Sequence, residues 1–230
     1  MTSTSTLPVV LCEADGTSVP IELAFDEVIL VGYTGRDRAA VLDHIRELES
    51  LGVAAPERVP AIYAVAADLV TTNACLAVRT PNTSGEAEFF MLHSAFGVLV
   101  GVGSDHTDRT QEAIDVAASK ALCGKVVSRE VWRFSAVAAH WDALELRAWT
   151  TDRAGRHLYQ SGRLDALLVV PDLLAEVEAA GITASHKLIF GGTLPTLGGF
   201  SFGQRFEVEL RDPVLHRTLR CAYDIVLEGV

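Results

Sequence analysis

The 230-residue sequence predicts a mixed α+β fold that is rich in β-strands. Most apolar runs are short, rich in β-branched residues and bounded by glycine, proline or polar residues, which is typical of strands. The few segments with helical periodicity do not alternate strictly with these strands. A doubly wound parallel sheet is therefore disfavoured.

The N-terminal part is expected to contain short strands and then one helix. Strands are predicted at Val9–Leu11, Ile21–Phe25 and Val28–Val31, and Gly32–Gly35 follows as a loop. A helix is predicted over Asp37–Leu51, because its apolar residues recur on one stripe and a glycine follows it.

The remaining elements begin with a hairpin. Its strands are predicted at Glu86–Leu92 and Val98–Val102, with His93–Gly97 as the loop between them. Helices are expected over Asp108–Leu122 and from Pro171 to Gly181, where proline opens and glycine ends the helix. The other short apolar segments are Ile62–Ala67, Leu144–Thr150, Leu158–Ser161, Leu188–Phe190, Phe206–Leu210 and Leu219–Val226.

Composition limits the possible partners of this protein. Hydrophobic residues make up 49% of the chain, enough for a globular core, but no apolar run is long enough for a transmembrane helix. The net charge is −11 and the basic residues are scattered, which excludes a generic nucleic-acid binder and suits a cation site. Four widely spaced cysteines without a C-x-x-C pair indicate reduced thiols and a cytoplasmic protein.

The predicted hairpin carries three acidic residues that can converge. Glu86 and Glu88 are two residues apart on a strand, so both point to the same face. If the hairpin turns at Ala95–Phe96, Asp105 falls opposite Glu86. Such carboxylates suit Mg²⁺, Mn²⁺ or Ca²⁺. Spacing alone favours a solvated strand face, but the polar, glycine-rich segment Gly101–Arg109 is typical of a functional site.

The order and spacing of several motifs resemble the fumarylacetoacetate hydrolase superfamily, and most closely an uncharacterised branch of it. The resemblance covers roughly residues 29–226. Departures are a shorter interval between E-x-E and the aspartate and a leucine, Leu194, where the family has proline. The matching segments are Val31–Tyr33, Asp43–Leu48 with its H-x-x-E, Glu86–Glu88, Ser104–Arg109, Lys125 twenty residues after Asp105, and Phe190–Pro195.

This resemblance implies roles for five further residues. His44 and Glu47 share a helix face and would activate a water molecule, the alternative being an exposed surface pair. Lys125 would stabilise an enolate or bind a carboxylate, and otherwise is a solvated lysine. Arg109 and Thr193 would bind substrate. The alternatives are that Arg109 only orders its loop through a salt bridge to Asp105 or Asp108, and that Thr193 only orders its turn.

The resemblance also implies a fold and a function. The expected fold is a rolled β-sandwich with inserted helices in one domain, 1–230, in which 1–60 supply N-terminal strands and a lid helix and 61–230 a catalytic β-roll core. The expected activity is that of a divalent-metal-dependent enzyme acting on a 2-oxo or 1,3-dicarbonyl acid through an enolate. The reaction expected before any other is C–C bond hydrolysis.

Alternatives to this activity stay open. The same site could decarboxylate, isomerise or hydrate a 2-oxo acid, or the protein could bind metal and ligand without catalysis. The expected partners are a small-molecule carboxylate and a second copy of the chain in a homodimer, with no nucleic acid and no membrane.

Overall fold

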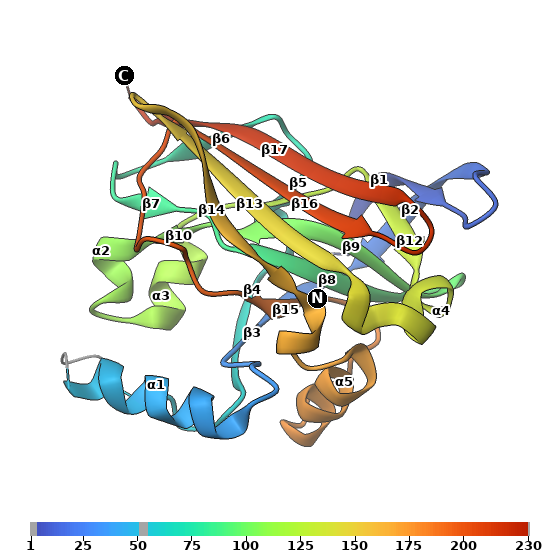
Figure 1. Ribbon diagram of the computed structural model, residues 1–230, viewed down its shortest axis with the longest axis horizontal. Helices are drawn as coiled ribbons and strands as arrows, with labels where there is room; N and C mark the ends of the chain where they lie inside the picture. The colour runs from blue at the N-terminus through green and yellow to red at the C-terminus, as the bar shows by residue number, and fades with distance from the viewer. Residues whose placement is uncertain (1–3, 51–54, 230) are drawn as a thin grey trace.

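Two packed β-sheets form the body of the protein in the computed structural model (Figure 1), which describes residues 4–50 and 55–229. The side chains of His44, Glu47, Leu48 and Ser50 lie outside this description. In Figure 1 the smaller sheet runs across the top, and the larger sheet lies behind and beneath it. Helices α1 and α5 lie below, α2 and α3 at the left, and α4 at the right. Among residues 4–50 and 55–229, no helix is long and apolar enough to cross a bilayer.

The larger sheet has ten strands and provides the candidate site. Its main path runs β2-β1-β12-β9-β8-β15-β3-β4, while β11 pairs with β9 and with β5. The strands are β1 (Ser5–Cys12), β2 (Ser18–Phe25), β3 (Glu27–Gly32), β4 (Ala61–Ala66), β5 (Val70–Thr71), β8 (Ala87–Ser94), β9 (Gly97–Asp105), β11 (Lys125–Val127), β12 (Glu130–Arg133) and β15 (Lys187–Thr193).

The smaller sheet has five strands in the order β14-β13-β16-β17-β6, and a separate two-stranded ribbon joins β7 to β10. These strands are β6 (Cys75–Val78), β13 (Glu145–Asp152), β14 (Gly155–Arg163), β16 (Arg205–Asp212), β17 (Arg217–Leu227), β7 (Thr83–Ser84) and β10 (Thr107–Asp108). The strand β17 runs parallel to β6, whereas β13, β14, β16 and β17 pair antiparallel.

The hydrophobic core has two parts, one on each face of the ten-stranded sheet. Between the sheets, Phe89 and Val102 of the β8–β9 hairpin pack in one cluster with Leu146 and Val208 of the smaller sheet. On the opposite face, side chains of β2 and β3 meet in one cluster although these strands lie near opposite ends of the strand order. The larger sheet is therefore rolled, and the expected rolled, β-rich sandwich is confirmed.

The helices are inserted between strands. They are α1 (Arg38–Ser50), α2 (Arg109–Glu112), α3 (Val116–Ala121), α4 (Phe134–Val137) and α5 (Val170–Ala179), with 3-10 turns η1 (Ala67–Leu69), η2 (Ala138–Ala143) and η3 (Leu164–Ala166). The helix predicted from Asp37 is present as α1, and its predicted last residue, Leu51, lies outside the described residues. Proline opens α5 as expected.

The single helix predicted over Asp108–Leu122 is wrong. The chain forms two short helices there, because two aspartates act as N-caps instead of continuing one helix. Asp108 accepts a hydrogen bond from the Gln111 N–H at 2.9 Å, and Asp115 accepts one from the Ala118 N–H at 3.0 Å. Aspartate at an interior position competes with helix hydrogen bonds in this way.

The β8–β9 hairpin has the register that positions the candidate site. Ser94 pairs with Gly97 across a two-residue turn, and Ala87 pairs with Ser104 at the other end. The next pair is closed by a hydrogen bond of 3.0 Å from the Asp105 N–H to the Glu86 carbonyl oxygen. The predicted turn and the predicted pairing of Glu86 with Asp105 are both confirmed.

Candidate metal centre

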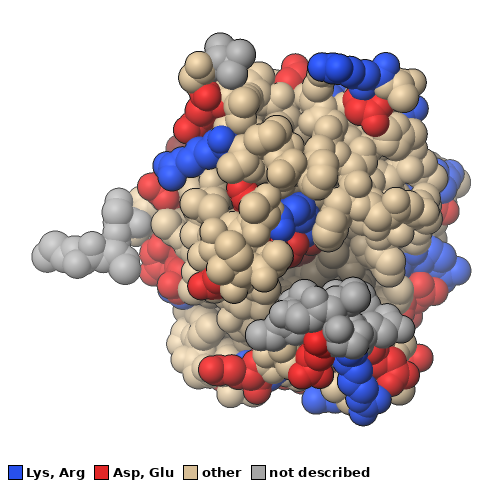
Figure 2. Space-filling model, turned by 90° about the vertical axis from the view of Figure 1, so that its left-hand side faces the viewer, with Lys and Arg blue, Asp and Glu red and all other residues tan. Residues whose placement is uncertain are grey.

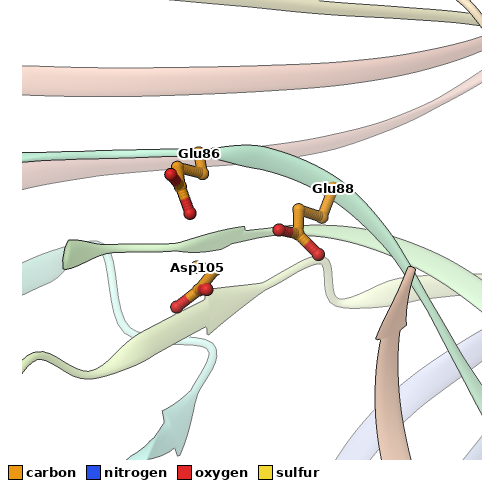
Figure 3. Close-up of side chains that lie close together, drawn as sticks. All are labelled: Glu86, Glu88 and Asp105. Carbon is orange, nitrogen blue, oxygen red and sulfur yellow. The ribbon is translucent and has the colours of Figure 1, made fainter. Parts of the chain in front are cut away.

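Three carboxylates converge at the open end of the β8–β9 hairpin (Figure 3). Glu86, Glu88 and Asp105 each offer one oxygen, and these oxygens all lie within 4.8 Å of one another. Glu88 and Asp105 are buried, while 15% of the Glu86 side chain is exposed. The structure thus brings together the three predicted ligands, of which Glu88 lies on β8, Glu86 directly before β8, and Asp105 at the end of β9.

Glu88 is the carboxylate whose charge the protein compensates least. Its Oε2 accepts a hydrogen bond of 2.8 Å from the Gly192 N–H, and among the described residues it forms no ion pair. Burial, followed by the neighbouring charges of Asp105 and Glu86, raises the pKa of Glu88 well above 4.5. A bound cation would stabilise the ionised form of this carboxylate, which burial and the two neighbouring negative charges destabilise.

Gly192 can reach Glu88 only because it is a glycine. Its φ of +91° lies in the left-handed region, and a Cβ there would lie 1.9 Å from the Thr34 Oγ1. Thr34 itself donates a hydrogen bond of 2.8 Å to the Gly191 carbonyl oxygen. The loop after β3 and the end of β15 are thereby fastened beside Glu88.

Lys120 lies between two of the three carboxylates. Its Nζ is 2.5 Å from the Glu86 Oε2 and 2.9 Å from the Asp105 Oδ2, and it donates to the Thr107 Oγ1 at 3.0 Å. Burial alone would lower the pKa of Lys120, but Asp105 and Glu86 outweigh burial and raise it. Lys120 is therefore a charged member of this site.

Sequence reasoning missed Lys120 because the twenty-residue spacing drew attention to Lys125. The signal that could have found it is Asp115, which lies five residues before Lys120 and is the N-cap of a new helix, α3. Because one continuous helix was expected over Asp108–Leu122, the sequence did not reveal that Lys120 faces the carboxylates.

Lys125 also reaches the site, from strand β11 opposite Asp105. Its Nζ is 2.7 Å from the Asp105 Oδ1 and donates to the His106 carbonyl oxygen at 2.8 Å, and the residue is fully buried. The predicted position is thus correct, whereas the predicted catalytic role stays a prediction.

Arg109 connects the site to the α2 helix. Its Nη1 is 3.0 Å from the Glu86 Oε1 and 2.7 Å from Glu112 Oε2, and its Nε donates to the Ser84 Oγ at 2.7 Å. Lys120 and Arg109 together overcome the effect of burial on Glu86 and lower its pKa to about 2. The expected loop-ordering salt bridge to Asp105 or Asp108 is wrong, because Arg109 pairs with Glu86 and Glu112 instead. The role of Arg109 in substrate binding stays a prediction, and its Nη2 has no hydrogen-bond partner among the described residues.

Thr193 lies next to the carboxylates but uses its hydroxyl within the protein. The Thr193 Oγ1 donates to the Ala87 carbonyl oxygen at 2.9 Å and accepts from the Gln160 Nε2 at 2.7 Å. The Gln160 Oε1 in turn accepts from the Ala87 N–H at 3.0 Å. Gln160, which the sequence did not point to, therefore holds β8 and β15 together beside the site.

His106 is buried behind Asp105 and bonds to Tyr223 instead of a carboxylate. The His106 Nδ1 lies 2.8 Å from the Tyr223 hydroxyl, which donates to the Ser104 Oγ at 2.8 Å. Burial, together with Lys125 and Arg109, lowers the pKa of His106 to about 3, so the ring is neutral.

His44 and Glu47 lie on α1, but their side chains are outside the described part of the structure. The predicted pair therefore stays a prediction.

The residues present fit a divalent cation. Three carboxylate oxygens within bridging distance are the hard ligands that Mg²⁺ and Mn²⁺ prefer, and Glu88 has no ion pair among the described residues. A cation bound by all three would share Glu86 and Asp105 with Lys120 or displace its ammonium group.

The rolled sandwich and the three carboxylates together define a protein with the fumarylacetoacetate hydrolase fold and a candidate divalent-cation site. Residues 31–223 match the family model described as "Protein of unknown function (DUF2848)", and the chain belongs to that family. The comparison with curated proteins found no match.

Several solved structures share this fold at low sequence identity. A 2-keto-3-deoxy-D-arabinonate dehydratase complexed with magnesium and 2,5-dioxopentanoate is 14% identical, with a TM-score of 0.62 over 89% of this chain and 74% of its own. Maleylpyruvate hydrolase from Sphingobium sp. SYK-6, with manganese(II) and pyruvate, is 16% identical, with a TM-score of 0.58 over 91% and 77%.

A third structure, yeast ynq8, is described as a fumarylacetoacetate hydrolase family protein. It is 14% identical, with a TM-score of 0.59 over 87% of this chain and 93% of its own. At these identities the likeness establishes the fold, and the predicted resemblance is confirmed at that level.

Proposed function

We propose that this protein is a divalent-cation-dependent enzyme that acts on a 2-oxo or 1,3-dicarbonyl acid through an enolate, and that the reaction it catalyses is C–C bond hydrolysis. The observation that carries the proposal is Glu88, a buried carboxylate without an ion pair among the described residues, within 4.8 Å of two others. Two structures with this fold contain magnesium or manganese together with a small oxo compound.

Glu86, Glu88 and Asp105 are the residues that would hold the cation. When bound, Mg²⁺ or Mn²⁺, or Ca²⁺ in their place, supplies Lewis-acid polarisation of the substrate carbonyl and stabilises negative charge on its oxygen. The carboxylates hold Lys120 and Lys125 in place through ion pairs, so both side chains can attract an anionic substrate.

Hydrolysis also requires that a water molecule be deprotonated. We assign this step to His44, with Glu47 fixing the imidazole tautomer, and we assign α1 the role of a lid that brings His44 to the substrate. Water adds to the distal carbonyl carbon and the adjacent C–C bond breaks. Its electron pair remains on the oxo-acid fragment as an enolate, which then takes a proton at carbon.

Arg109 and Thr193 are assigned to substrate binding. The Arg109 Nη2 is a buried donor without a hydrogen-bond partner among the described residues, which suits a substrate carboxylate. Thr193 would contribute its remaining lone pair or a rearranged hydroxyl, since its hydroxyl is bonded to Ala87 and Gln160.

Two alternatives each have an observation in their favour. Decarboxylation, isomerisation or hydration needs the same cation and enolate, and one structure with this fold is a dehydratase. A non-catalytic binding protein is favoured by Lys120, because its ammonium already forms ion pairs with Glu86 and Asp105, the two carboxylates that it would have to share with a catalytic cation.

The experiment that tests the proposal is an activity screen with Mg²⁺ or Mn²⁺ over acylpyruvates, oxaloacetate and related 2-oxo acids. The proposal expects cation-dependent turnover by the wild-type protein and none by Glu88→Gln. Cation binding without turnover of any member of the set would favour the binding protein, and turnover that survives a chelator would contradict the proposal.

A further inference from the structure

Three aromatic side chains from separate segments border the charged site. They are Tyr33 in the loop after β3, Tyr63 in β4 and Phe200 in the loop between β15 and β16, and we call them the aromatic rim. Figure 2 shows the left-hand side of Figure 1, where α2 and α3 lie. This face is hollowed, and basic and acidic side chains lie beside the hollow among uncharged residues. The chemistry of the rim differs from that of the carboxylates beneath it.

Phe200 covers Arg109, which is bound to one of the proposed cation ligands. The guanidinium carbon of Arg109 lies 4.2 Å from the centre of the Phe200 ring, yet Phe200 is 56% exposed. Its neighbours Leu197 and Phe202 are also exposed, at 59% and 47%. Large apolar side chains gathered in one short exposed loop are typical of a binding surface.

The loop that carries Phe200 passes beside α2, whose first residue is Arg109. In Figure 1 the connection from β15 to β16 passes beside α2 and β10 at the left of the molecule. It contains Gly199 with a φ of +81°, and no atom lies within 4 Å of a Cβ built there. Position 199 therefore faces open space, while a hydrogen bond of 2.9 Å from the Leu197 N–H to the Tyr159 carbonyl oxygen holds the start of the loop in place.

Tyr33 reaches the same charged groups from the loop after β3. It has a φ of +57°, a conformation that costs a bulky residue free energy and that recurs at functional sites. Burial, followed by the charge of Glu112, raises the pKa of the Tyr33 hydroxyl, and the charges of Lys120 and Glu86 also act on it. Tyr63 lies next to this loop, because a Cβ built at Gly32 would be 3.8 Å from the Tyr63 Cε2. Glu86 and Glu112 are also the partners of Arg109, so Tyr33 and Phe200 border one site.

The basic side chains of this site are already engaged. Lys120 and Lys125 are ion-paired with Asp105, and Arg109 with Glu86 and Glu112. The Arg109 Nη2 is the remaining donor of these three residues without a hydrogen-bond partner in the described structure. This arrangement suits one substrate carboxylate near the cation and offers little to a second, distal carboxylate.

We propose that the substrate is a 2-oxo acid whose other end is uncharged and aromatic, and that the aromatic rim binds this end with Phe200 as the specificity-determining residue. This inference rests on the proposed function, because the carboxylates must first place the oxo-acid end. An aromatic ring packed against Phe200 and the two tyrosines gains contacts that an aliphatic carboxylate cannot form.

The test measures binding of three probes in the presence of Mg²⁺ by calorimetry. Phenylpyruvate carries an aromatic end, 2-oxoglutarate a distal carboxylate, and pyruvate no tail. We expect wild type to bind phenylpyruvate at least tenfold more tightly than 2-oxoglutarate. Phe200→Ala should weaken phenylpyruvate by about three- to tenfold, the usual range for a lost aromatic contact, and change pyruvate less than twofold. Phe200→Tyr should bind phenylpyruvate as tightly as wild type does, because it keeps the aromatic ring.

Val19→Ala is the matched control, because Val19 is also a large exposed apolar side chain, at 45%, but lies on β2 outside the aromatic rim and its loop. It should change binding of each probe less than twofold. Tighter binding of 2-oxoglutarate by wild type, or equal weakening of phenylpyruvate and pyruvate by Phe200→Ala, would overturn the inference while leaving the proposed function intact. Failure of all three probes to bind with Mg²⁺ present would instead remove the proposed function, and this inference with it.

Discussion

Glu86 and Glu88 are two residues apart, and the structure predicts opposite effects on stability when each is replaced by glutamine. Glutamine has nearly the shape of a protonated glutamate, so each change removes the negative charge and preserves packing. Glu86 forms ion pairs with Lys120 and Arg109, whereas Glu88 forms none among the described residues. Glu86→Gln should therefore destabilise the cation-free protein, and Glu88→Gln should stabilise it.

The size of the stability loss expected for Glu86→Gln follows from the pKa of Glu86. A pKa of about 2 against an ordinary value of 4.5 corresponds to about 3 kcal/mol of stability from the charged form. Because the folded pKa is lowered, this contribution is present above pH 4.5 and is lost as the pH falls from 4.5 to about 2. Glu86→Gln should lower the free energy of unfolding by about this amount at pH 7, and should not show that acid-induced loss.

The sign for Glu88 is the reverse because its pKa is raised by burial and by Asp105 and Glu86. Its contribution is present below pH 4.5 and is lost as the pH rises through the folded value. Each unit by which the folded pKa of Glu88 exceeds 4.5 corresponds to about 1.4 kcal/mol of unfolding free energy. For a chain of this size this is about 3–6 °C in melting temperature. Glutamine keeps an oxygen that can accept the Gly192 N–H, so the main change is the charge.

The assay is thermal unfolding at pH 7 with and without Mg²⁺, with Glu22→Gln as the control. Glu22 is exposed on β2, so its replacement should change stability by less than about 0.5 kcal/mol. Mg²⁺ at a hundred times its dissociation constant should stabilise wild type by about 2.7 kcal/mol and Glu88→Gln hardly at all. A lower melting temperature for cation-free Glu88→Gln than for wild type would refute this reasoning.

Three further predictions follow from individual contacts. Lys120→Met should raise Mg²⁺ affinity at least tenfold in calorimetry, because it removes a positive charge from between two ligands; unchanged affinity would mean that Lys120 does not compete with the cation. Gly192→Ala should cost several kcal/mol in urea unfolding, because its Cβ would meet the Thr34 Oγ1, whereas Gly16→Ala, with a similar φ and open surroundings, should cost only the backbone strain of about 1–3 kcal/mol. His44→Ala should keep cation affinity but lower hydrolysis by about two to four orders of magnitude; wild-type hydrolysis in this variant would remove His44 from the mechanism.

The sequence allowed the carboxylate group to be predicted because it depends on strand geometry alone. The E-x-E spacing places Glu86 and Glu88 on one face, and a two-residue turn at Ala95–Phe96 fixes the partner of Glu86 as Asp105. Register propagates along a hairpin without slippage when both strands are buried, as they are here. The strand-rich fold was predictable for the same reason.

The residues around the carboxylates could not be predicted from local patterns. Lys120 reaches them because Asp115 caps a second short helix, and a helical pattern over Asp108–Leu122 does not reveal that break. Gly192 and Gln160 act through contacts between segments far apart in the sequence, 104 and 73 residues from their partners Glu88 and Ala87. The homodimer stays a prediction, because the structure describes one chain.

The central claim is that Glu86, Glu88 and Asp105 bind one divalent cation. The most direct measurement is an anomalous difference map from crystals grown with Mn²⁺. We expect a single strong peak within about 2.0–2.6 Å of an oxygen from each of the three carboxylates, with the Lys120 Nζ moved away from its position between Glu86 and Asp105. A peak elsewhere, or none while Lys120 still bridges Glu86 and Asp105, would contradict the claim.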